Sequence, residues 1–219
     1  MARPPGRWGT LFESLIEKRR SPGNLGPDTR MGISEYILAL MSIVVGLAMT
    51  QLLGGAAEIV QPGRSVRTYW IHSAWMIYLF VTLIHFWWWE FGLMRIQSWT
   101  FLPYAFVICF AVLLYFLVAL LVPQHLGSQT DLKEYFYGRR SWFFGTMAAI
   151  QLVDFGDTLV KGWAYFRGLG LEYPIRNLAI LVLSILAMRT RKEWFHAAMV
   201  LLLIAYQVLW IMRHFNRAG

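Results

Sequence analysis

Residues 151–163, QLVDFGDTLVKGW, combine two aspartates, a glutamine, a threonine and a lysine within a strongly apolar region. On a helix, steps of three, four and three residues place Gln151, Asp154, Thr158 and Lys161 on one polar face. Asp157 lies at the margin of this face. Asp157 and Lys161 are four residues apart with the acid first, the favourable order for an ion pair. The spacing predicts a polar helical stripe in which Asp154 needs a partner from elsewhere.

His85 is the candidate partner, because it is expected at a comparable depth in a parallel helix. A histidine beside a carboxylate in a low-dielectric site exchanges a proton near neutral pH. The ionisable groups predicted to gather toward one leaflet are Glu35, His85, Glu90, Asp154, Asp157 and Lys161. Their functional interpretation is proton or cation handling, with Gln151 and Thr158 as neutral ligands. The structural interpretation is a buried network that only holds helices together.

The composition places these groups in a membrane. The chain has 219 residues, is 58% hydrophobic and has a mean hydropathy of +0.48, too apolar for an ordinary soluble domain. Windows of about 20 apolar residues predict an all-α polytopic membrane helix bundle of about six transmembrane helices, at 33–57, 68–91, 100–122, 142–161, 174–189 and 194–213. An aspartate near the centre of a span costs roughly 2.5 to 3.5 kcal/mol, so Asp154 needs a partner, a proton or a water-filled cavity.

The first 30 residues differ in composition from the rest. Residues 1–30 are rich in Arg, Pro and Gly and predict a flexible basic extension, whereas 31–219 form the six-span bundle. Within the extension, Thr10 and Glu13 have the spacing of a capping box, which predicts a short amphipathic helix on the membrane surface.

A second surface segment is expected between the third and fourth spans. Asp131 and Glu134 have the same capping spacing, and Gly138 is a helix-ending residue. The segment 128–140 therefore predicts an interfacial helix of one or two turns.

The first span carries small residues at intervals of four. Ser42, Gly46, Thr50 and Gly54 share one stripe, and small residues at this spacing let helix backbones approach closely. The stripe predicts a packing seam, either within the bundle or between protomers of a homo-oligomer, and lining a pore is the alternative.

Basic residues give an orientation but no nucleic-acid site. The net charge is +8, yet the 20 Lys and Arg residues are spread over every polar segment and form no groove-sized patch. A cytoplasmic N-terminus puts 12 of them inside and 8 outside, which is the favoured arrangement. Without residues 1–30 the balance becomes 6 against 8, so the orientation depends on the extension.

Motifs for catalysis and cofactors are not found in the sequence. Cys109 is the single cysteine, so neither an internal disulfide nor a thiolate metal site is expected. His72 and His196 begin parallel spans and make a bis-histidine haem conceivable, but hydrated interfacial histidines are the favoured interpretation. No metalloprotease helix or nucleophile elbow is present, so the sequence leans against an enzyme. No metal and no cofactor are predicted.

Several short motifs resemble those of one protein group. These are a first span ending in a Gly-rich turn, VRTYWIH opening the second, HFWWWEFG closing it, and RRSWFFG opening the fourth. Over roughly 31–160 the chain is similar to a group of uncharacterised bacterial multi-spanning inner-membrane proteins. The resemblance implies a bacterial cytoplasmic membrane and brings no substrate, reaction or catalytic residue.

Two functional hypotheses follow from the sequence. The first is proton- or cation-linked movement of a small solute or ion through a polar pocket between the second and fourth spans. The second is a non-catalytic accessory or scaffold subunit that binds another membrane protein through the small-residue stripe and aromatic faces. In both, the lipid bilayer is the surrounding partner and nucleic acid is not.

Overall fold

The computed structural model describes residues 32–61, 66–96, 99–123 and 130–215, and these residues are predominantly helical. Among them, the only β-type pairing is an isolated bridge between Arg67 and Asp131. The long helices are α2 (Ile33–Val60), α3 (Trp70–Trp89), α4 (Phe101–Leu121), α5 (Leu132–Val160), α7 (Glu172–Arg189) and α8 (Glu193–Phe215); η1 (Glu90–Arg95) and α6 (Trp163–Gly168) are short. The predicted all-α bundle of membrane type is confirmed.

Five of these helices are long and apolar enough to cross a membrane. The candidate spans are Ile33–Val60, Trp70–Met94, Phe101–Leu121, Leu132–Val160 and Glu193–Arg213. α7, which corresponds to the predicted fifth span, is not among them. It has 18 residues and contains Glu172, Arg176 and Arg189, so its apolar character is interrupted by charge. The sixth crossing therefore stays a prediction.

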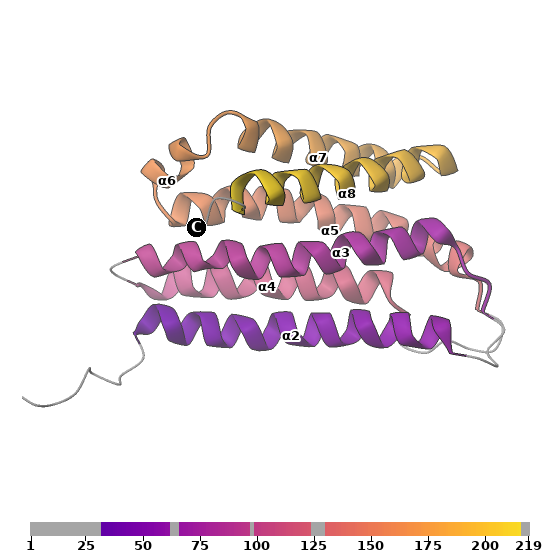
Figure 1. Ribbon diagram of the computed structural model, residues 1–219, viewed down its shortest axis with the longest axis horizontal. Helices are drawn as coiled ribbons and strands as arrows, with labels where there is room; N and C mark the ends of the chain where they lie inside the picture. The colour runs from indigo at the N-terminus through magenta and orange to yellow at the C-terminus, as the bar shows by residue number, and fades with distance from the viewer. Residues whose placement is uncertain (1–31, 62–65, 97–98, 124–129, 216–219) are drawn as a thin grey trace, which may run out of the picture. The chain divides into compact units, whose positions relative to one another are not determined.

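The long helices lie side by side and alternate in direction (Figure 1). α7 packs most extensively along α5, α4 packs against both α2 and α5, and α3 packs against α8. Aromatic contacts tie α3 to α5, where the Trp75 ring meets Phe143 and Phe144 edge-on at centroid distances of 5.4 and 5.2 Å. This arrangement brings α3, α5, α7 and α8 around one polar region.

The start of α5 corrects one prediction. Asp131 caps the helix, because its side chain accepts hydrogen bonds from the backbone N–H groups of Lys133 and Glu134. The helix does not stop at Gly138, however, but continues without a break to Val160. The separate interfacial helix predicted for 128–140 is therefore wrong, since continuing the backbone ladder satisfies polar groups that a break would expose.

The end of α5 is set by a glycine. Lys161 is the C-cap of the helix, and Gly162 follows with φ of 117° and ψ of 148°, a conformation that is accessible essentially only to glycine. The chain then forms α6 and returns as α7 along the face of α5. This turn holds Lys161 at the end of the polar stripe.

The small-residue stripe of α2 faces outward in the described chain. Gly46, Thr50 and Gly54 are exposed, and a Cβ atom added at Gly46 or Gly54 would meet nothing within 4 Å. The buried face of α2 consists of larger residues: Ile37, Met41, Val45, Ala48 and Leu52. The stripe is therefore not a seam within this bundle, and a seam between protomers stays a prediction.

Ser42 begins the stripe and has a different role from its other members. Its hydroxyl donates to the Leu38 carbonyl at 2.8 Å and accepts from Trp87 Nε1 at 2.8 Å. This contact joins α2 to α3. Close glycine packing by α2 occurs instead at Gly55, whose added Cβ would overlap the Val122 side chain.

The predicted extension, with Thr10 and Glu13, lies outside the described residues.

Candidate functional site

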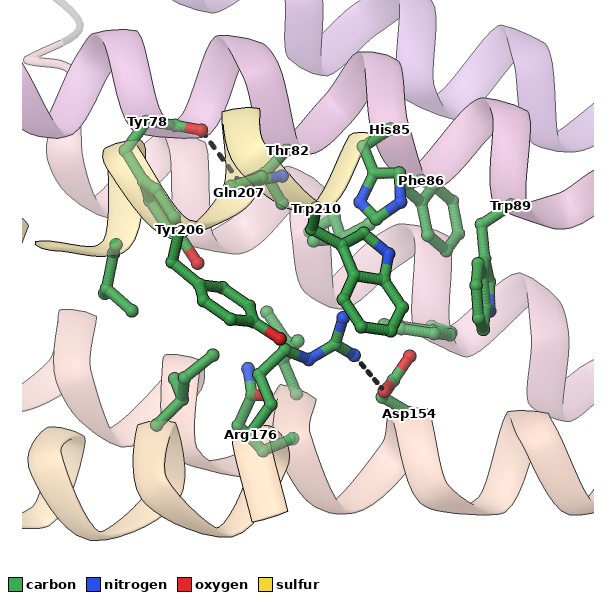
Figure 2. Close-up of a pocket in the computed structure, with 16 residues that line it drawn as sticks. Tyr78, Thr82, His85, Phe86, Trp89, Asp154, Arg176, Tyr206, Gln207 and Trp210 are labelled. Atoms are coloured by element: carbon green, nitrogen blue, oxygen red, sulfur yellow. Dashed lines mark hydrogen bonds and ion pairs between the residues drawn. The ribbon is translucent and has the colours of Figure 1, made fainter. Parts of the chain in front are cut away.

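A cavity of about 110 Å³ lies between α3, α4, α5, α7 and α8. That space is large enough for several water molecules or one small solute. Figure 2 shows the labelled side chains converging on it, with His85 and Thr82 reaching in from α3 and Asp154 and Arg176 from α5 and α7. The lining residues are Tyr78, Thr82, His85, Phe86, Trp89, Phe110, Leu114, Ile150, Gln151, Asp154, Arg176, Ile180, Leu203, Tyr206, Gln207 and Trp210.

Asp154 has its partners on α7. Its carboxylate oxygen Oδ2 accepts a hydrogen bond from the Tyr173 hydroxyl at 2.8 Å and another from Asn177 Nδ2. The Arg176 guanidinium lies 3.7 Å from the same oxygen and forms an ion pair with it. The need of Asp154 for a partner is thus met by α7, rather than by His85 as the sequence suggested.

Arg176 is held in place from several directions. Its Nε and Nη2 atoms donate to Asn177 Oδ1 at 3.0 and 2.8 Å. Its guanidinium carbon lies 5.2 Å from the ring centroid of Tyr173 and 5.2 Å from that of Trp210, within the range of a cation–π contact. The side chain is therefore positioned at the cavity wall with its charge balanced by Asp154.

His85 lines the same cavity as Asp154, and proton exchange between the two residues stays a prediction. Its imidazole packs edge-on against the Trp89 ring, with 6.0 Å between the ring centroids. Gln151, on the predicted polar face of α5, is also in the lining and is 8% exposed. The polar groups at the cavity thus come from α3, α5, α7 and α8.

The Asp157–Lys161 ion pair is present, as the spacing predicted. Lys161 Nζ donates to Asp157 Oδ2 at 2.6 Å, and it also donates to Glu90 Oε1 at 3.0 Å. The three side chains are no more than 1% exposed. Glu90 therefore joins this pair from η1, and we refer to Glu90, Asp157 and Lys161 as the buried ion triad.

The remaining predicted residues occupy other positions. Thr158 is buried, and its hydroxyl lies 2.7 Å from the Tyr173 hydroxyl, so it supports the partner of Asp154. Glu35 is exposed near the start of α2 and is not among the cavity-lining residues. Of the six ionisable groups, two line the cavity and three form the ion triad.

His72 and His196 are buried, so the interpretation of hydrated interfacial histidines is wrong. His72 Nε2 lies 2.8 Å from the Leu121 carbonyl, and His196 Nε2 lies 3.1 Å from the Thr190 carbonyl. A carbonyl only accepts, so each Nε2 carries a proton and donates. Both rings connect helix ends, and neither Nε2 is available as a haem ligand in this arrangement.

The sequence reasoning missed the contribution of α7 and α8. Arg176 and Asn177 lie within the predicted fifth span, and Gln207 lies within the predicted sixth. A charged or amide side chain inside a span is itself a signal of a polar site. Counting every polar residue in those two spans would have identified these three side chains.

The site combines charged, amide and hydroxyl groups with aromatic walls. Carboxylate, guanidinium, amide and hydroxyl groups meet at an aromatic cavity, an arrangement suited to a small polar solute.

Within the described parts of the chain, no group of three or more His, Cys, Asp or Glu side chains is placed to hold a metal ion. Comparison with known protein families, with curated proteins and with solved structures gave no match.

Proposed function

We propose that this protein moves a small polar solute or ion across a membrane, with the movement linked to a proton or another cation. Five apolar helices are compatible with an integral membrane protein. The observation that carries the proposal is the cavity between the helices, whose wall contains the Asp154–Arg176 ion pair. The depth of the cavity supports it, because Phe110 and Leu114 line it from the middle of α4.

The lining also supports a polar solute. Arg176 and Asp154 offer opposite charges, while Gln151 and Gln207 offer amide donors and acceptors. Aromatic side chains line the cavity beside these groups, and such partly buried surroundings strengthen each polar contact with a bound solute. In this proposal His85 and Asp154 are the groups at the solute that exchange a proton.

The proposed setting is the bacterial cytoplasmic membrane. The resemblance over residues 31–160 supports it, together with the basic segments expected to contact anionic headgroups.

A flux assay in reconstituted vesicles tests the proposal. The unmutated protein is expected to release a trapped small solute or ion when a pH gradient is applied, and Asp154→Asn is expected to abolish this flux. Because Asp154→Asn leaves Arg176 without its counter-charge, the double variant Asp154→Asn/Arg176→Gln is tested beside it. The double variant restores charge balance but not the titrating group, so it should fold and remain inactive.

Glu134→Gln is the matched control. It makes the same acid-to-amide change at an exposed position of α5 and should leave flux unchanged. Normal flux in the folded double variant would contradict the role of Asp154.

A scaffold role is the second candidate function. The outward-facing stripe of Gly46, Thr50 and Gly54 favours it, because small exposed residues allow close approach of a partner helix. If the unmutated protein supports no flux of any tested ion or solute across a pH gradient, the scaffold role becomes the better proposal.

A further inference from the structure

The buried ion triad lies beside the cavity but does not line it. Glu90 comes from η1, Asp157 from the last turn of α5, and Lys161 from the C-cap position directly after α5. The Lys161 ammonium contacts one oxygen of each carboxylate, at 3.0 and 2.6 Å. Its aliphatic stem is covered by Gly92, where an added Cβ would lie 3.3 Å from Lys161 Cδ. The triad is therefore enclosed by protein.

The charges of the triad do not balance. Two ionised carboxylates and one ammonium leave a net charge of −1 in a site that is almost completely buried. An unbalanced buried charge is strongly destabilising, because it has lost its hydration, so the site favours one more positive charge. Arg176 does not supply it, because its own charge is paired with Asp154. Other titratable or charged groups on the elements packed around the triad include Glu35, Glu58, His85, Asp154, Tyr165, Arg167, Glu172, Tyr173, Arg176 and Arg189.

Two oxygen atoms in the triad lack a hydrogen-bond donor. Glu90 Oε2 and Asp157 Oδ1 are buried, and neither accepts a hydrogen bond from any residue in the described part of the chain. A buried acceptor without a donor is destabilising, because it has lost water without gaining a protein partner. A proton on either carboxylate removes the excess charge and converts one of these acceptors into a hydroxyl donor.

A proton suits this site better than a metal ion. The ammonium already occupies the position between the carboxylates, so a second cation there would be repelled. A metal ion also requires several ligands, whereas the triad offers only two carboxylate groups. A proton requires a single oxygen atom.

Aromatic rings connect the triad to the cavity. Lys161 Nζ lies 5.6 Å from the ring centroid of Trp89, and Trp89 itself lines the cavity. The Trp89 ring stacks on that of Tyr173 with 6.2 Å between the ring centroids, and the Tyr173 hydroxyl donates to the Asp154 carboxylate. One layer of side chains therefore separates the triad from the charged wall of the cavity.

We infer that the buried ion triad of Glu90, Asp157 and Lys161 binds one exchangeable proton, shared by its two carboxyl groups. Its role as a further proton site of transport, beside His85 and Asp154, rests on the proposed function. The solute then binds at Asp154 and Arg176, and the triad holds its own proton one aromatic layer away.

Infrared spectroscopy of the full chain in lipid nanodiscs tests the inference. A protonated carboxyl group gives a carbonyl stretch that shifts on deuteration, and the unmutated protein should show this band and lose it as the pH rises. Glu90→Gln and Asp157→Asn should each abolish the band, because the remaining carboxylate is balanced by Lys161. Lys161→Met should about double the band, since it leaves two buried acids and no ammonium.

Two controls assign the band to the triad. Glu134→Gln, at an exposed position, and the charge-balanced Asp154→Asn/Arg176→Gln variant should both retain it. Each acid-to-amide change in the triad removes excess charge, so these variants are expected to fold. An unmutated protein without the band, or a band retained in both Glu90→Gln and Asp157→Asn, would overturn the inference.

The flux assay separates this inference from the proposed function. A triad band without any solute flux contradicts the transport proposal and leaves the proton site standing. A proton-linked flux without a triad band contradicts the proton site and leaves the transport proposal standing. A sodium-dependent loss of the band at constant pH would show that a metal cation replaces the proton and would overturn the assignment to a proton alone.

Discussion

Arg176 and Asp154 form an ion pair of 3.7 Å that joins α7 to α5 at the wall of the cavity. Both side chains are mostly buried, with exposed fractions of 16% and 17%. The pair accounts for the presence of an aspartate deep in an apolar helix, because its counter-charge comes from the next long helix of the chain. It also explains how α7 retains an arginine among apolar residues.

Breaking this pair from one side should be more damaging than removing both charges. We expect Asp154→Leu or Arg176→Leu to lower the free energy of unfolding by about 3 kcal/mol, because each leaves one uncompensated charge. The double variant should lose less than either single variant. Denaturant unfolding in detergent measures all three, and additive losses would show that the two charges do not interact.

Adjacent glycines of α2 should respond differently to substitution. Gly55→Ala is expected to destabilise the protein by about 1 to 3 kcal/mol, because the new Cβ overlaps the β-branched Val122 side chain. Gly54→Ala is the matched control, since its Cβ meets nothing within 4 Å and alanine favours helix. Thermal unfolding compares them, and equal melting temperatures would contradict the packing of α2 against the end of α4.

The backbone at Gly162 should tolerate no side chain. Gly162→Ala is expected to lower stability by about 1 to 3 kcal/mol, because φ of 117° is strained for any L residue with a Cβ. Gly168→Ala, at the end of α6 and without positive φ, should have little effect. Thermal unfolding of the two variants in detergent provides the comparison. An unaffected Gly162→Ala protein would mean that the turn after Lys161 relaxes freely.

The α2 stripe should affect assembly and not folding. Gly46→Leu places its side chain in open space in the described chain, so the melting temperature of the protomer should not fall. If two copies meet through this stripe, which is one of the two seams that the sequence allows, the same change should reduce the oligomer mass in mild detergent. Light scattering measures that mass, and an unchanged mass would remove the stripe as a protomer contact.

The crossing of α7 can be tested by topology reporters. With six crossings, a reporter at the C-terminus of the full chain should be cytoplasmic, and deleting residues 1–30 should weaken that orientation. Reporters inserted at Gly170 and Arg191, which flank α7, should lie on opposite sides of the membrane. The same location for both would reduce the count to the five apolar spans.

Hydropathy predicted the long helices because crossing a bilayer requires a long run of apolar residues. Hydropathy did not predict where α5 begins. The polar helical segment from Leu132 to Arg140 lies outside the apolar window, but its backbone hydrogen bonds continue into the rest of the helix. Asp131 correctly predicted the cap. The prediction that the helix stops at Gly138 was wrong, because a glycine within a helix weakens the helix without ending it.

Which neighbouring helix each side chain contacts was harder to predict than the helices themselves. The Asp157–Lys161 pair was predictable because both residues lie on one helix at a fixed spacing. The partner of Asp154 was not, because it depends on which helix packs against α5. The sequence also left open whether the stripe of Gly46 and Gly54 packs within the bundle or between protomers. Lipid and protein interior are both apolar, so a membrane helix gives little hydrophobic signal of its buried face.

The neutrality of the Asp154–Arg176 pair has an electrical consequence. A transmembrane voltage of 100 mV does about 2.3 kcal/mol of work on one elementary charge that crosses the bilayer. Two opposite charges that move together carry no net current, so a shift of this pair would itself draw almost no energy from the membrane voltage. Voltage dependence would then arise from other charges, such as those of the buried ion triad or of a bound solute.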